Sequence, residues 1–244
     1  MPSLGIIGCV SASSLVTFRP HIIFDGTDGN IAVGDVSELS FEGQTDAFTL
    51  SGWVKVDPSH SASVTFMGKQ ESSGNFRGWS FRLRGSSVLT FEIVNTAING
   101  IVVDGTGANI ADDSWHHVAV TVDGSGDASG VLMYVDGVLY GSTPVLDSLS
   151  ATTVNTVGMA IGMRRVGGDL PMDGSLSQMA VHNSVLTPAQ ILAEFNGVPT
   201  VDLVGHWELG GPNDVYPTIP DHSPSGNDGT MTNMAADDIV KSPS

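Results

Sequence analysis

Planar cationic and aromatic side chains occupy two alternating segments of the sequence, and together they could bind a sugar. Within residues 78–84, Arg82 and Arg84 share one face of the alternation, while the apolar residues share the other. An arginine offers several hydrogen-bond donors in one plane, and a tryptophan ring offers a flat apolar surface. Trp53 is the aromatic candidate in a second alternating segment, 48–56. The candidate ligand-binding residues are therefore Trp53, Arg82 and Arg84.

The same two segments also allow a purely structural interpretation. Trp79 alternates with Phe81, which is the pattern of a strand whose apolar face packs into a core. Arg82 and Arg84 could pair with Glu92 on a neighbouring strand instead of binding a ligand. The residue pattern alone leaves both interpretations open.

The seven histidines form no recognisable catalytic or zinc-binding motif. His116 and His117 are adjacent in a predicted strand, so one of them must point inward, where a hydrogen bond to the backbone would satisfy it. The spacing of the other five offers no set of zinc ligands. The Gly-x-Ser-x-Gly sequence of many serine hydrolases is also absent from the sequence.

The composition is that of an all-β protein with an acidic surface. The 244 residues are 41% hydrophobic and 14% charged, and 30 are glycine, which suits short strands joined by tight turns. A net charge of −17 repels nucleic-acid phosphates, so we expect no nucleic-acid partner. No apolar run approaches the roughly 20 residues of a membrane span, so we expect no membrane insertion.

Apolar alternation broken by turn residues dominates residues 21–181 and predicts many short strands. Asp136-Gly137 is typical of a two-residue hairpin turn between two of them. The main predicted strands cover residues 21–24, 31–33, 48–56, 78–84, 88–94, 116–122, 131–135, 138–140, 160–163 and 176–182. Because βαβ units are absent, this pattern indicates an antiparallel β-sandwich.

One helix is predicted near the end of this run. Thr187 is a suitable N-cap, Pro188 suits the first helical position, and Gln190 lies where a capping box needs it. Gly197 is the expected end. Three regions follow from these patterns: an N-terminal arm, residues 1–20; a sandwich domain, residues 21–197; and a C-terminal strand and loop-rich tail, residues 198–244.

Five segments carry a resemblance to a known family. Phe48–Val54, Ser114–Thr121 and Met133–Val138 are similar to strands of laminin-G-like jelly rolls, which belong to the concanavalin A-like lectin/glucanase superfamily. Met172–Leu176 and Leu186–Ile191 resemble the closing strand and short helix of that family. The resemblance implies an all-β fold, an antiparallel two-sheet jelly-roll sandwich with one short C-terminal helix.

The resemblance also implies a structural calcium ion. Members of the superfamily often bind one Ca²⁺ through aspartates and backbone carbonyls, and the Asp25-Gly26 and Asp173-Gly174 turns match two family motifs. The first and last strands of such sandwiches tend to be neighbours, which would bring Asp25 and Asp173 together with Asp28 nearby. The candidate metal ligands are Asp25, Asp28 and Asp173, and the alternative is a pair of ordinary Asp-Gly turns.

We do not expect the chain to be an enzyme. Some relatives in the superfamily are glycoside hydrolases, which need two carboxylates on either side of the scissile bond. No predicted strand carries acidic residues at alternate positions, and Glu92 stands alone between Phe91 and Ile93. A glucanase-like hydrolase is therefore the less favoured alternative, and the sequence suggests no catalytic residue.

The tail contains a segment outside its usual order. Leu203–Leu209 and Asp221–Thr230 resemble a segment that normally precedes the first family strand. We expect residues 203–209 to complete the sandwich in a permuted order or to pair with a neighbouring subunit. Together with Gly229–Met234, this order is similar to laminin-G-like proteins of tailed-phage particles.

These resemblances imply a non-catalytic binding or structural module of a bacteriophage virion, such as a head decoration, fibre or tail accessory protein. The expected partners are other virion proteins or sister subunits in a homo-oligomer, and host surface glycans are a further candidate ligand. Such a protein would assemble in the host cytoplasm. The alternative is a secreted, extracellular lectin or adhesin, for which we would expect a signal peptide that the sequence does not show.

Overall fold

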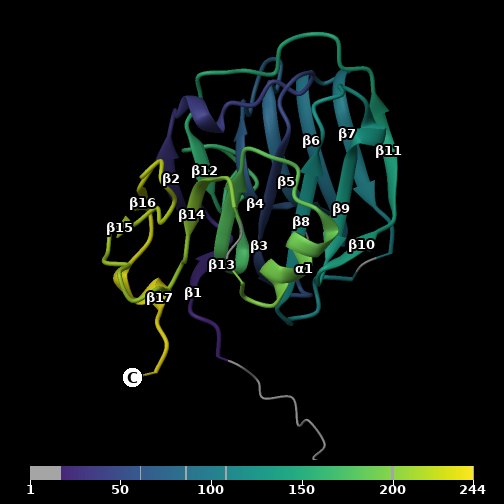
Figure 1. The fold of residues 1–244 in the computed structure, drawn as a ribbon. Helices are drawn as coiled ribbons and strands as arrows, with labels where there is room; N and C mark the ends of the chain where they lie inside the picture. The colour runs from purple at the N-terminus through teal and green to yellow at the C-terminus, as the bar shows by residue number, and fades with distance from the viewer. Residues whose placement is uncertain (1–17, 61, 86, 108, 199–200, 244) are drawn as a thin grey trace, which may run out of the picture.

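The computed structural model describes residues 18–60, 62–85, 87–107, 109–198 and 201–243. Two antiparallel β-sheets pack face to face, and one short α-helix lies against one of them (Figure 1). This arrangement confirms the predicted fold class. Residues 1–17, which make up most of the predicted N-terminal arm, lie outside the described residues.

Sheet A has eight strands within the described residues. In order across the sheet they are β10 (Val138–Tyr140), β9 (Val131–Val135), β8 (His116–Val122), β3 (Phe48–Val56), β13 (Asp173–His182), β1 (His21–Asp25) and β17 (Ile239–Val240), with β14 (Leu203–Trp207) also paired to β13. The first strand thus lies beside β13, as the family resemblance implies.

Sheet B has nine strands in the same part of the chain. In order they are β11 (Ser142–Asp147), β7 (Asn99–Gly105), β6 (Val88–Thr96), β5 (Gly78–Arg84), β4 (Val64–Gln70), β12 (Met159–Ile161), β2 (Asn30–Gly34), β16 (Gly229–Thr232) and β15 (Thr218–Ile219). The described 3₁₀ segments are Ser37–Leu39, Ala128–Gly130 and Ala236–Asp238.

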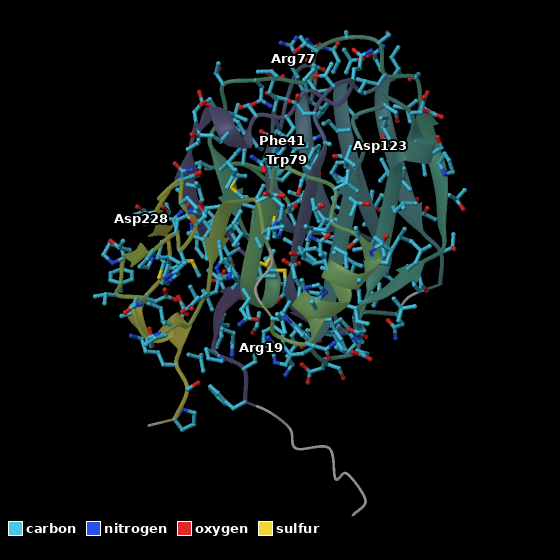
Figure 2. The ribbon with its side chains drawn as sticks, in the orientation of Figure 1. Arg19, Phe41, Arg77, Trp79, Asp123 and Asp228 are labelled. Atoms are coloured by element: carbon cyan, nitrogen blue, oxygen red, sulfur yellow. The ribbon has the colours of Figure 1, made fainter. Side chains whose placement is uncertain are left out.

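Every second side chain of the long strands faces the core between the two sheets. On β5, Trp79, Phe81 and Leu83 are buried, as their alternation predicts. The Trp79 indole N–H donates to the carbonyl oxygen of Leu39 at 2.9 Å, and the Phe41 ring lies beside it in the middle of the sandwich (Figure 2). The same alternation turns the arginines of β5 toward the outer face of sheet B.

The C-terminal tail is an integral part of both sheets. The sequence predicts one strand there, and the structure has four short ones, because strands of two to five residues carry too little alternation to be recognised. β14 pairs with β13, β16 with β2, and β17 with β1. Trp207 is fully buried, and its indole N–H donates to the Asn227 carbonyl oxygen at 3.0 Å. Residues 203–209 therefore complete the sandwich, which is one of the two predicted arrangements.

The helix α1 (Pro188–Phe195) packs on the outer face of sheet A and forms as predicted. The Thr187 hydroxyl accepts a hydrogen bond from the Gln190 backbone N–H, and the Gln190 side chain accepts one from the Thr187 N–H at 2.8 Å. Gly197 ends it with a φ of +79°. Ile191 is fully buried against side chains of β8 and β9. No helix in the described part of the chain is long and apolar enough to cross a membrane.

Candidate functional site

A groove of about 390 Å³ lies over the outer face of sheet B, and we call it the arginine groove. Strands β4 to β7 supply its floor, and the loops before β5 and β13 supply part of its walls. Its lining residues are Ser63, Gln70, Phe76, Arg82, Arg84, Glu92, Val94, Ala97, Val102, Arg164 and Leu170.

Two of the groove arginines are held by carboxylates on the same sheet. Arg82 makes a two-armed contact with Glu92, in which Nη2 donates to Oε2 at 2.7 Å and Nη1 donates to Oε1. Arg84 donates to Asp104, whose other oxygen accepts from Thr90 at 2.8 Å. The predicted pairing with Glu92 is thus confirmed for Arg82, while Arg84 finds a different partner. Both guanidinium planes are fixed before any ligand arrives.

The third groove arginine, Arg164, comes from the loop between β12 and β13. This loop crosses the sheet where β4 carries Gly68, and a Cβ atom there would lie 2.5 Å from the Arg164 carbonyl oxygen. The Arg164 side chain reaches Asp169 at 3.0 Å and lies over the Phe76 ring, 5.6 Å from its centroid. Burial lowers the pKa of Arg164, and the neighbouring Asp169 opposes that shift. Glycine at 68 therefore lets this loop form one wall of the groove.

Several polar atoms at this face have no hydrogen-bond partner in the described chain. Gln70 is 1% exposed and lines the groove, and its Oε1 accepts no hydrogen bond. Two more buried atoms lack a hydrogen-bond partner, namely Arg82 Nε and the Thr65 hydroxyl. Thr65 is the cross-strand partner of Arg82. Buried polar atoms are nearly always partnered by protein or water, so these atoms await water or a ligand. Gln70 and Arg82 line the groove together with the apolar ring of Phe76, and this combination suits a ligand that has both hydroxyl groups and apolar patches.

The charge of the groove differs from that of the whole chain. Three of the six arginines in the sequence line it, although the net charge is −17. Each has one carboxylate partner, namely Glu92, Asp104 or Asp169. The groove is therefore close to neutral within a strongly acidic protein.

Trp53, the third predicted ligand-binding residue, lies on the other side of the sandwich. It belongs to β3 in sheet A, and the residue is 8% exposed. The Arg19 guanidinium covers the ring at 3.4 Å from its centroid, and the Phe195 ring stacks with it at 5.4 Å. The structure therefore brings Arg82 and Arg84 together but not Trp53, because β3 and β5 belong to opposite sheets.

The predicted calcium ligands are partly brought together. Asp25 and Asp173 are direct cross-strand partners on β1 and β13. Asp25 Oδ1 accepts from the Thr27 N–H at 3.0 Å, and Asp28 Oδ2 accepts from the Asn233 side chain at 3.1 Å. Within the described ranges, no three histidine, cysteine or acidic side chains lie close enough to hold a metal ion. The structure thus makes two of the three predicted ligands, Asp25 and Asp173, cross-strand partners.

Sequence reasoning missed most of the groove lining, including the three residues Gln70, Phe76 and Arg164. Phe76 and Arg164 lie in loops, where no periodicity marks a functional side chain. A signal did exist, because Arg164 and Arg165 are adjacent in a chain with only nine basic residues. Gln70 ends a strand whose alternation is broken by a bulge between Thr65 and Met67, which hides the direction of its side chain.

Solved structures resemble this fold at low sequence identity. A candidate carbohydrate-binding protein from Bacteroides ovatus ATCC 8483 is 19% identical, with a TM-score of 0.64, covering 89% of this chain and 59% of its own. The CBM40 module of Ruminococcus gnavus IT-sialidase bound to α2,3-sialyllactose is 18% identical, with a TM-score of 0.55, covering 73% and 97%. The binding domain of Paraclostridial Mosquitocidal Protein 1 is 14% identical, with a TM-score of 0.53, covering 72% and 45%. The chain thus spans about three fifths of the Bacteroides protein.

Family membership follows from the sequence itself. A search of curated proteins finds no match to this chain. The profile of the Laminin_G_3 family, described as the concanavalin A-like lectin/glucanases superfamily, matches residues 25–192. Since this is more than half of the sequence, the chain belongs to the concanavalin A-like lectin/glucanases superfamily.

Proposed function

We propose that this chain is a non-catalytic carbohydrate-binding module whose ligand lies in the arginine groove. The observation that carries the proposal is that Gln70 Oε1 and Arg82 Nε, both without a hydrogen-bond partner, belong to residues that line the same groove as the Phe76 ring. A pyranose ring offers matching chemistry, because its hydroxyl groups pair with planar donors and its C–H face packs on apolar surface. The sialyllactose-bound module and the Bacteroides protein support the choice of ligand class.

Binding without catalysis is favoured by the state of the groove carboxylates. Both Glu92 oxygens accept hydrogen bonds from Arg82, and Asp104 is engaged by Arg84 and Thr90. A glycosidase needs one carboxyl group that can give up a proton and a second that faces the sugar from the other side. Carboxylates already committed to guanidinium groups are poor candidates for either role.

The experiment is an isothermal titration calorimetry measurement of the binding of α2,3-sialyllactose and, separately, of lactose. We expect saturable binding that Phe76→Ala weakens at least tenfold, because the apolar wall is lost. Arg84→Gln should weaken binding of the acidic sugar more than that of lactose, and the Arg84 side chain is 44% exposed, so this variant should fold. Arg165→Gln removes the same charge outside the groove lining and serves as the control. The proposal would be refuted if the protein bound neither of the two sugars and none of the other glycans on an array.

We further propose that the module is carried on a bacteriophage particle, as a head decoration, fibre or tail accessory protein in homo-oligomeric form. The support is the tail order, in which Leu203–Leu209 and Gly229–Met234 resemble laminin-G-like phage proteins. The test is mass spectrometry of purified particles from the phage or prophage that encodes the chain. If the purified particles do not contain this protein, the role is contradicted. The alternative is then a secreted lectin or adhesin.

A structural calcium ion between Asp25 and Asp173 also stays a proposal. Its support is the direct register of the two carboxylates on neighbouring strands. Ca²⁺ prefers six to eight oxygen ligands, so backbone carbonyls and water would complete the shell. Calorimetric titration with CaCl₂ tests it, and Asp173→Asn should abolish the signal. A signal unchanged in that variant would place the ion elsewhere.

A further inference from the structure

A second pocket lies on the opposite side of the sandwich, on the outer face of sheet A beside α1. It has a volume of about 80 Å³. Strands β3, β8, β13 and β14 and the helix all contribute to it. The polar and aromatic lining residues are Ser51, Trp53, His117, Gln178, Glu194 and His206. This pocket shares no residue with the arginine groove.

The polar side chains of this pocket include one group with no hydrogen-bond partner in the described chain. His117 is 2% exposed, its Nδ1 is fully buried, and neither ring nitrogen makes a hydrogen bond. The His206 ring and the Ser51 hydroxyl line the same pocket. A buried polar group that lacks a partner loses its hydration without compensation. The buried, unpartnered Nδ1 of His117 in the lining of this small pocket therefore points to a hydrogen-bonding ligand.

A positive charge without a carboxylate partner lies beside the pocket. The Arg19 guanidinium stacks on Trp53, and its Nη1 donates to the Gln178 side-chain oxygen at 3.1 Å. Arg19 makes no ion pair within the described residues, although 26 acidic residues face nine basic ones in the sequence. Figure 2 shows Arg19 at the end of the sandwich where β1 begins, far from Arg77. Burial lowers the pKa of Arg19 to about 10, so the group stays charged at neutral pH.

The one carboxylate in the pocket lining, that of Glu194, is in contact with a buried histidine. Glu194 Oε1 lies 2.9 Å from Nε2 of His182, which is fully buried. The Nδ1 of His182 donates to the Val201 carbonyl oxygen at 2.8 Å, because a carbonyl only accepts. The Glu194 carboxylate therefore already has a partner within the chain.

We propose that this pocket binds a compact carboxylate, with Arg19 supplying the charge and His117, His206 and Ser51 supplying hydrogen bonds. With a volume of about 80 Å³, the pocket accommodates a group of a few heavy atoms, such as one carboxylate. A larger acid would place its carboxylate here and extend outward. The site is independent of the arginine groove and of the function proposed for it.

Carboxylate binding should take up protons. Burial lowers the pKa of His117 to about 4 and also lowers that of His206, so both rings are neutral in the empty protein at pH 7. The charged groups around His117 are Arg19, Glu194 and Asp136. Those around His206 are Glu208, Glu194 and Asp221, together with the His222 ring. An anion bound against the rings would favour their protonated forms. Binding should therefore tighten as the pH falls from about 8 to about 6.

The probe is sodium acetate, and sodium chloride keeps the ionic strength constant during the titration. NMR signals of the histidine rings report the binding. We expect a saturable shift of the His117 and His206 signals at millimolar acetate, with affinity at least tenfold lower in Arg19→Gln. Arg165→Gln removes an equal charge away from the pocket and should bind acetate like the unmodified chain. His117→Gln should reduce the proton uptake, measured by calorimetry in buffers of different ionisation enthalpy, because only the His206 ring remains to take up a proton.

Two results would overturn the proposal. One is the absence of any saturable shift up to about 0.1 M acetate, and the other is equal acetate affinity in Arg19→Gln and Arg165→Gln. Unfolding curves of each variant show whether it is folded, so that a lost signal is not a lost structure. Retained acetate binding in Phe76→Ala separates this site from the arginine groove, because that variant tests the sugar site alone.

Discussion

His116 is held between two carboxylates at one end of β8. Its Nδ1 lies 2.9 Å from Asp136 Oδ2, and its Nε2 lies 3.2 Å from Asp112 Oδ1. The hydrogen bond with Asp136 raises the pKa of His116, and partial burial opposes that shift. Because the folded-state pKa exceeds the unfolded value, the stabilisation is fully present below about pH 6.5 and is lost as the pH rises through the folded pKa.

We therefore expect His116→Gln to destabilise the protein more at about pH 5.5 than at about pH 8.5. Urea unfolding of both proteins at the two pH values gives the difference in free energy of unfolding. A difference that is the same at both pH values would show that His116 carries no charge-dependent interaction.

His117, the next residue, should act in the opposite direction. Burial lowers the pKa of His117 to about 4. Below about pH 6.5 the unfolded chain binds a proton that the folded chain does not, so stability falls as the pH decreases toward 4. The slope attributable to one proton is about 1.4 kcal/mol per pH unit. His117→Gln should flatten the curve of unfolding free energy against pH between 4 and 6.5, and an unchanged slope would contradict the buried neutral ring.

At the scale of elements, α1 depends on its capping box. The Thr187 side chain accepts from the Gln190 N–H and thereby satisfies one of the free donors at the helix N-terminus. Thr187→Ala should lower the free energy of unfolding by about 1 kcal/mol. Thr143→Ala, on the exposed edge strand β11, is the matched control and should stay within about 0.5 kcal/mol of the unmodified chain. Urea unfolding measures both, and equal effects would mean that the cap adds nothing.

The elements that the sequence predicts best are those with a strong local pattern. The alternation of Trp79, Phe81 and Leu83 places β5 and its buried face, and Thr187 with Gln190 places the start of α1. These patterns depend only on neighbours within a few residues. The short strands after residue 197 lack such a pattern, and their pairing with β13, β2 and β1 depends on contacts between distant segments.

The candidate site was predictable only in part for the same reason. Alternation shows that Arg82 and Arg84 share a face, but it does not show which sheet a strand joins. Trp53 therefore looks equivalent to the arginines in sequence, although β3 and β5 are in different sheets. Phe76 and Arg164 lie in loops, and the loop that carries Arg164 can cross β4 because residue 68 is glycine.

At the scale of the whole molecule, the C-terminal tail should be essential for folding. β14 forms hydrogen bonds with β13, and Trp207 is fully buried in the core. Truncation after residue 198 removes this side chain and leaves strand edges of both sheets unpaired. We expect the truncated chain to be insoluble or to unfold without a cooperative transition, as judged by thermal melting. A cooperative transition at the midpoint of the full chain would show that the tail is dispensable.

The net charge of −17 makes the stability of the whole molecule depend on ions. With 26 acidic and nine basic residues, self-repulsion opposes the compact state. Raising NaCl from about 0.01 M to about 0.15 M shortens the screening length from roughly 30 Å to roughly 8 Å. The melting temperature should therefore rise with the NaCl concentration. A melting temperature that stays constant or falls would contradict destabilisation of the folded state by self-repulsion.

Calcium at equal ionic strength separates binding from screening. An ion held between Asp25 and Asp173 stabilises the folded state by mass action, so CaCl₂ should raise the melting temperature beyond the NaCl value. Asp173→Asn should lose this extra rise. Asp123→Asn makes the same change of charge at a distant turn (Figure 2) and should keep it. Because both variants lose one negative charge, only a bound ion at the strand pair explains a difference between them, and equal behaviour would leave screening as the whole effect.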